Sequence, residues 1–182
     1  EFASAKSDQL PDFIPPVDIL TNGSPRLHER VGANSPRFGG VDGTLAQWHF
    51  YTFTNYHDAT NANGTVYGSN VAFVVFGVPD LALPRNDEAD VDLYVSFDPG
   101  LTNLVPSVVA SAFRSASRLG SEYVVFTNAP NTNEIFYVGV KSEDQQAAEY
   151  NIVGISSDQP FSRRDPDGRI RIQGFPVFSP IP

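Results

Sequence analysis

Acidic side chains crowd into one short stretch of the sequence, and their spacing suits a cation. Asp87 and Glu88 precede Asp90 and Asp92, and Asp80 lies a few residues upstream. On a strand, Asp90 and Asp92 share one face about 6.6 Å apart. Calcium takes about 6–8 oxygen ligands, which carboxylates and loop carbonyls provide. The pattern predicts a calcium site at Asp80, Asp87, Glu88, Asp90 and Asp92.

The same residues also have a simpler interpretation, which the sequence leaves open. Asp87 and Glu88 would be solvated, and Asp90 or Asp92 would accept hydrogen bonds from turn amides. Like charges packed together repel each other unless a cation or hydrogen bonds offset them. A metal and a turn therefore remain alternatives for this segment.

The residues that could carry catalysis are few. The sequence has no cysteine, and its three histidines are His28, His49 and His57. His49 lies inside an alternating strand pattern beside Trp48, which favours a structural role. There is no G-x-S-x-G elbow, no H-E-x-x-H helix and no phosphate-binding glycine loop. We expect no catalytic site.

Exposed aromatic rings offer a second chemistry, stacking on sugars. Tyr56 and Tyr67 flank the polar loop from 55 to 65 and are the candidates for ligand binding. Most other aromatic residues should be core or cross-strand partners, and Trp48 is expected to be buried. The alternative function is therefore a carbohydrate-binding or adhesive module.

Charge and composition restrict the partners. The 182 residues carry a formal net charge of -9, which disfavours nucleic acid and anionic membranes because both attract basic surfaces. No apolar run approaches the ~18 residues that span a bilayer. A polar, acidic chain without cysteine is typical of secreted bacterial domains. We expect a secreted or cell-surface location, with an extracellular glycan or protein as a further partner.

The elements that must position these residues are strands. Alternating or fully apolar stretches predict strands at 47–54, 71–78, 91–97, 122–127, 135–141, 150–156 and 169–173. Only 107–119 could be helical, and its apolar spacing is poor. Turn signals separate the strands. The pattern predicts an all-β fold of the β-sandwich class.

Prolines set the predicted boundaries. Pro11, Pro15, Pro16 and Pro25 exclude a continuous helix or a central strand near the start of the sequence. The end of the sequence is also rich in proline. We therefore expect a linker at 1–25, the sandwich at 26–156, and a C-terminal strand or hairpin with a linker at 157–182. Neighbouring domains of the same polypeptide are then the natural partners.

Five motifs occur in a fixed order over about 110 residues. They are Trp48-x-Phe50-Tyr51-x-Phe53, Asp90-Val91-Asp92-Leu93-Tyr94-Val95, Gly120-Ser121-Glu122-Tyr123-Val124, Phe136-Tyr137-Val138-Gly139-Val140 and Glu149-Tyr150-Asn151-Ile152. This succession resembles the bacterial pre-peptidase C-terminal domain. The resemblance implies a jelly-roll-type β-sandwich, akin to the P domains of proprotein convertases. It also implies a non-catalytic accessory module that stabilises, spaces or targets a neighbouring domain of a secreted protein, and some similar domains bind calcium.

Overall fold

The computed structural model describes residues 17–32, 47–55, 70–77, 90–117, 121–127, 129, 134–143, 148–157 and 161. The described strands are β1 (Val17–Leu20), β2 (Arg26–Val31), β3 (Trp48–Asn55), β4 (Asn70–Gly77), β5 (Val91–Ser96), β6 (Phe113–Ser115), β7 (Glu122–Thr127), β8 (Glu134–Ser142) and β9 (Ala148–Ser157). A 3-10 turn, η3 (Pro99–Leu101), and a short helix, α1 (Pro106–Ser111), separate β5 from β6.

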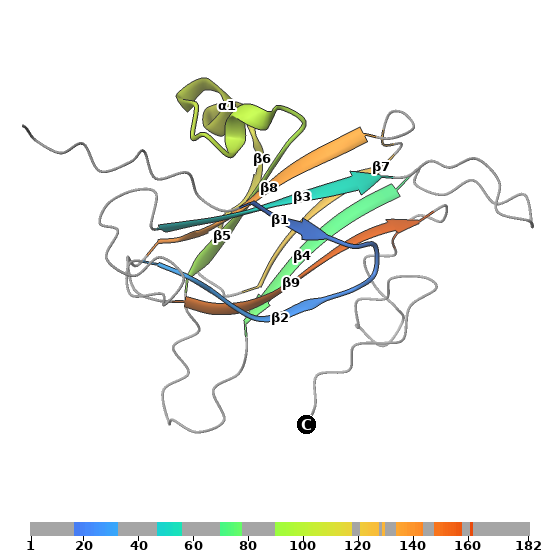
Figure 1. The fold of residues 1–182 in the computed structure, drawn as a ribbon, viewed down its shortest axis with the longest axis horizontal. Helices are drawn as coiled ribbons and strands as arrows, with labels where there is room; N and C mark the ends of the chain where they lie inside the picture. The colour runs from blue at the N-terminus through green and yellow to red at the C-terminus, as the bar shows by residue number, and fades with distance from the viewer. Residues whose placement is uncertain are drawn as a thin grey trace, which may run out of the picture.

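The strands form two sheets that pack face to face (Figure 1). Sheet A has the order β1-β3-β8-β5-β6, and sheet B has the order β2-β9-β4-β7. Among the described strands, only β5 and β6 follow each other within one sheet. The crossing of the chain from sheet to sheet is typical of jelly-roll-type sandwiches. The predicted all-β sandwich is confirmed.

The core between the sheets is built from the inward positions of the alternating strands. Phe53, Phe73 and Phe136 are at most 1% exposed, and the rings of Phe53 and Phe73 meet edge to face at 5.3 Å. Edge-to-face pairs of this kind add to the burial of apolar area. Gly154 of β9 leaves the room that the Phe53 ring occupies, because a Cβ there would lie 2.8 Å from Phe53 Cδ2.

A second, smaller core covers part of the outer face of sheet A. Trp48, Phe50 and Tyr94 point outward from the sheet and pack against Leu101 and Val108 of the η3–α1 segment. Trp48 is 3% exposed, so its predicted burial is confirmed. The predicted helical stretch 107–119 is in part the helix α1 and in part the edge strand β6.

The first strand lies where the sequence predicts a linker. β1 pairs in parallel with β3, with Val17 opposite Phe50 and Leu20 opposite Phe53. The prolines before it do not prevent this, because an edge strand needs hydrogen bonds on one side only. Residues 17–20 therefore belong to the sandwich. The predicted strand at 169–173 lies outside the described residues.

Candidate functional site: a polar cluster between the sheets

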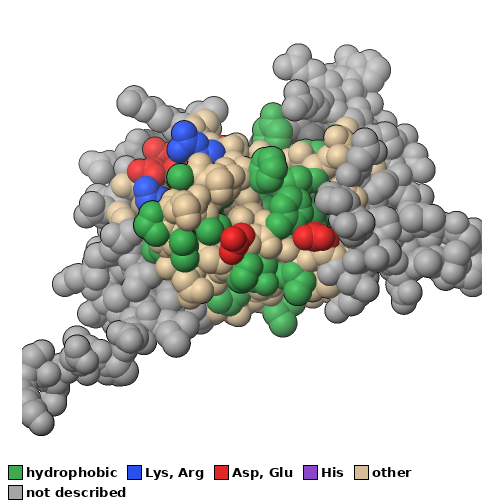
Figure 2. Space-filling model, turned by 90° about the horizontal axis from the view of Figure 1, so that it is seen from above, with side chains coloured by type: hydrophobic (Ala, Val, Ile, Leu, Met, Phe, Trp, Pro, Cys, Tyr) green, Lys and Arg blue, Asp and Glu red, His purple; other side chains and the backbone are tan. Residues whose placement is uncertain are grey.

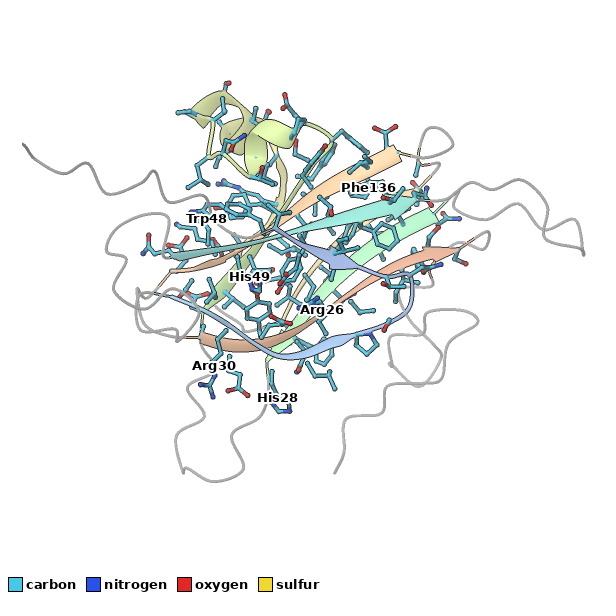
Figure 3. All side chains as sticks on the ribbon, viewed as in Figure 1. Arg26, His28, Arg30, Trp48, His49 and Phe136 are labelled. Carbon is cyan, nitrogen blue, oxygen red and sulfur yellow. The ribbon has the colours of Figure 1, made fainter. Side chains whose placement is uncertain are left out.

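A cluster of ionisable and hydroxyl side chains fills the edge of the sandwich where β1 and β2 face each other across the two sheets. We call it the edge cluster. It consists of Asp18 from β1, Arg26 and Glu29 from β2, His49 and Tyr51 from β3, and Tyr150 from β9. Figure 3 shows Arg26 and His49 between the sheets, with Trp48 on the other side of β3.

Strand alternation places His49 and Tyr51 in the interior. Trp48 and Phe50 occupy the outer face of β3, so the side chains of His49 and Tyr51 point toward sheet B. Both are fully buried, as is Tyr150. The alternation predicts this arrangement from the sequence.

A β-bulge brings the β2 residues to the same place. Arg26 pairs with Ile152 and Glu29 pairs with Tyr150, so β2 has one more residue than β9 over this stretch. Without the extra residue, Arg26 and Glu29 would face opposite sides. His28 takes up the bend with a φ of 56°. The bulge thus turns both Arg26 and Glu29 toward His49.

The hydrogen-bond distances around His49 are consistent with a neutral imidazole. Its Nε2 lies 3.0 Å from Asp18 Oδ2, and because an ionised carboxylate can only accept, Nε2 donates. The Tyr150 hydroxyl lies 2.6 Å from His49 Nδ1. The Tyr51 hydroxyl lies 2.9 Å from the same nitrogen and 2.7 Å from the Tyr150 hydroxyl. A neutral imidazole therefore fits, with Nδ1 accepting from a tyrosine.

Arg26 contacts both carboxylates and offsets one of their two negative charges. Its Nη2 lies 3.2 Å from Asp18 Oδ2, and its Nε donates to Glu29 Oε1 at 2.8 Å. Burial opposes the charge of Arg26, but the hydrogen bond and charge of Glu29 outweigh it and raise the pKa of Arg26. Burial raises the pKa of Tyr51 well above its usual range, which keeps its hydroxyl protonated.

The same groups include a donor set for a metal. One ligand atom each from Asp18, Glu29 and His49 lie within 4.8 Å of one another, and it is the one such group among the described residues. Imidazole and carboxylate ligands suit a transition metal. In this structure the guanidinium of Arg26 lies against both carboxylates, at the place where a metal ion would supply positive charge.

The residues predicted to bind calcium are only partly described. Asp80, Asp87 and Glu88 lie outside the described residues. Asp90 directly precedes β5, and Asp92 lies on the outer face of β5 opposite Lys141, with 5% of its surface exposed. The predicted calcium site thus stays a prediction.

Asp92 has a partner that the sequence did not indicate. It hydrogen-bonds to Glu143, which follows β8, and Lys141 Nζ donates to Glu143 Oε1 at 2.5 Å. Burial, the hydrogen bond to Glu143 and the charges of Glu143 and Asp90 raise the pKa of Asp92 to about 7. Lys141 lowers the pKa of Glu143, so the two carboxyls share one proton unequally.

The predicted sugar-binding tyrosines, Tyr56 and Tyr67, also lie outside the described residues. The surface seen from the α1 side carries hydrophobic side chains interspersed with acidic ones near its centre, and Lys and Arg beside acidic side chains at one flank (Figure 2). The segment around α1 and β6 contributes exposed Val105 and Phe113. No described helix is long and apolar enough to cross a membrane.

Comparison with solved structures finds a likeness in fold. No protein-family model matches the sequence, and no curated protein matches it. The fold is similar to the 1.0 Å crystal structure of the pre-peptidase C-terminal domain of collagenase from Bacillus anthracis. The identity is 9% and the TM-score 0.43, over 77% of this chain and 95% of that one. The five ordered motifs resemble the family that is named in the description of that solved domain.

Proposed function

We propose that the chain is a non-catalytic accessory β-sandwich module of a larger secreted or surface-attached bacterial protein. Its role is to stabilise, space or target a neighbouring domain of the same polypeptide. The ordered motifs and the acidic composition without cysteine support this assignment. The exposed hydrophobic residues around α1 and β6 suit contact with another protein domain better than contact with a charged ligand.

The observation that carries the proposal is the burial of the edge cluster between the sheets. His49, Asp18 and Tyr150 are residue types that could relay a proton, but the reactive groups of His49, Tyr51 and Tyr150 are buried between the sheets. A general base must come within hydrogen-bond reach of its substrate. The cluster instead joins β1 and β2 to the rest of the sandwich. We therefore assign the edge cluster a structural role rather than a catalytic one.

A direct test compares the parent polypeptide with and without residues 17–157. We expect the neighbouring domain to lose thermal stability, protease resistance or localisation when the sandwich is removed, while the isolated chain hydrolyses no peptide, ester or glycoside. A matched pair, wild type and His49→Gln, is assayed alongside. Hydrolysis by the isolated chain that disappears in His49→Gln would overturn the proposal.

We also propose that calcium stabilises the module at Asp90 and Asp92, assisted by Glu143. A cation would replace the proton that Asp92 shares with Glu143 and would displace Lys141 from that carboxylate. Because a ligand that binds only the native state raises its stability by mass action, millimolar calcium should raise the melting temperature over that in EDTA.

The control variants separate a site from a general salt effect. Asp92→Asn should abolish the calcium shift, and Glu149→Gln, which removes an acid from the surface of β9, should keep it. An equal melting temperature in calcium and EDTA for the wild type would contradict the calcium proposal and leave the accessory role standing.

A further inference from the structure

The chain enters the sandwich at Val17 and leaves it at Ser157, and these two points are separated along the strand direction. The turn after β1 sits beside the end of β9, where Ser156 N donates to Asn22 Oδ1 at 2.8 Å and Gly23 N donates to Gly154 O at 2.9 Å. The start of β1, at Val17, therefore points away from the end of β9 at Ser157. Figure 1 shows β1, β3 and β9 running in the same direction.

Tension applied through the flanking residues would thus act along the strands. Pulling Val17 away from Ser157 would slide β1 along β3, and four residue pairs, from Val17–Phe50 to Leu20–Phe53, would carry the load together. The bonds of a parallel pair are evenly spaced along the strand, so a force along the strand is shared among them. Pulling across the strands would instead open the pairs one after another.

Asp18 adds a side-chain anchor to this pairing. Its Oδ2 is bound by His49 Nε2 of β3 at 3.0 Å and by Arg26 Nη2 of β2 at 3.2 Å. Asp18 therefore ties β1 to both sheets. Bonds to charged groups are stronger than those between neutral groups, and partial burial limits the screening of this pair by salt.

Comparison with β9 and β2 indicates that β1 is the strand whose release limits the resistance to tension. β9 has ten residues and pairs with β2 on one side and β4 on the other, so it resists sliding over a longer ladder. β2 begins at Arg26, next to the turn that follows β1. Once β1 has been released, β2 would peel from that end. The resistance to tension is therefore set by β1 and Asp18.

We propose that β1 and Asp18 form a mechanical clamp, which lets the sandwich carry tension between the segments on either side of it. This inference rests on the proposed function, because a clamp has work to do only in a module held within a longer chain. It adds to that function a load-bearing role and names the strand that bears the load.

The test is single-molecule force-clamp measurement on the full chain. One arm attaches handles to the two chain ends and loads β1 along its axis. The other attaches them to the N-terminus and to Arg30→Cys on β2, which pulls β1 across the gap between the sheets. The chain has no cysteine, so this attachment is unique. Arg30→Cys pulled from its two ends is the matched reference.

We expect slower rupture in the end-to-end arm at the same force. Asp18→Asn should speed end-to-end rupture about tenfold or more, because it removes bonds to charged groups. Glu149→Gln, which weakens the exposed contacts of β9 with His28 and Arg30, should leave the rate within about twofold. Equal rupture rates in the two arms, or equal effects of the two variants, would overturn the clamp.

This experiment is independent of the accessory role. It uses the chain alone and needs no neighbour, so a failed clamp leaves the parent-polypeptide comparison unaffected. A module without influence on its neighbours could, conversely, still show the clamp in the force measurement.

Discussion

The distances within the edge cluster suit a continuous chain of hydrogen bonds. His49 Nε2 donates to Asp18, and His49 Nδ1 accepts from the Tyr150 hydroxyl, the closer of the two tyrosines. The Tyr51 hydroxyl then donates to the Tyr150 oxygen at 2.7 Å. Each of these protons has an acceptor inside the cluster. Buried polar groups arranged in this way specify one structure, whereas the removal of one member leaves its partner with a desolvation cost.

Tyr150→Phe tests that assignment. The variant keeps the ring in the core but removes the donor to His49 Nδ1 and the acceptor for Tyr51, and we expect a loss of about 1–3 kcal/mol in the free energy of unfolding. Urea denaturation followed by circular dichroism measures it. Tyr123→Phe, at a ring that is 50% exposed, should change stability by less than about 0.5 kcal/mol. An equal effect of both variants would contradict the hydrogen-bond chain.

Asp92 predicts a pH dependence of stability. Its pKa is raised to about 7 by burial and by Glu143, so between about pH 4 and 7 the folded state holds a proton that the unfolded state has released. Stability should therefore fall as the pH rises through this range and level off above it. Denaturation at intervals from pH 5 to 8 follows the loss.

Two variants isolate this effect. Asp92→Asn cannot ionise, so its stability should lose the decline that Asp92 contributes between pH 5 and 8. Glu149→Gln should keep the decline, because the hydrogen bond from His28 lowers the pKa of Glu149 rather than raising it. An unchanged slope in Asp92→Asn would assign the decline to other groups.

At the scale of single elements, β3 separates two cores. Its inner face joins the edge cluster and the core between the sheets, and its outer face holds Trp48 and Phe50. Period-two alternation predicts both faces from the sequence. The bulge in β2 was not predictable, because it depends on the register of Arg26 and Glu29 against β9. The assembly of the edge cluster also depends on contacts between residues distant in sequence, which no local pattern encodes.

Gly139 of β8 makes room for the outer core. A Cβ on Gly139 would lie 3.0 Å from Trp48 Cζ3 and 3.2 Å from Phe50 Cε1. Gly139→Ala should therefore push the stacked rings away from the sheet and cost about 1–3 kcal/mol in the free energy of unfolding. Urea denaturation followed by circular dichroism measures it, with Val125→Ala at an exposed position of β7 as the control. Unchanged stability would mean that the rings shift without cost.

At the scale of the whole molecule, the sandwich is joined along both of its edges by charged groups. The β1–β2 edge is held by the edge cluster. At the β6–β7 edge the buried Glu122 carboxylate accepts hydrogen bonds from Ser115 and Ser117. The sequence predicts the sandwich and most of its strands. It does not predict that β1 belongs to the sandwich, since a parallel edge strand of four residues after a proline-rich stretch has no distinctive pattern.

A pair of truncations tests the beginning of the sandwich. Deletion of residues 1–25 removes β1 and Asp18 and leaves His49 without its acceptor, so we expect a loss of several kcal/mol or failure to fold. Deletion of residues 1–16 keeps β1 and should retain most of the stability. Thermal melts compare the two. Similar stability of both truncated chains would mean that residues 17–25 act as a linker and do not stabilise the sandwich.

Trp48 has a consequence for spectroscopy. It is the single tryptophan of the chain, and it lies on the outer face of sheet A under the η3–α1 segment, away from the core between the sheets. Its fluorescence therefore reports whether that segment is seated on the sheet, while the circular dichroism of the strands reports whether the two sheets are intact. A lag between the two signals during unfolding would reveal a partly open state in which the covering segment has detached and the sandwich has survived.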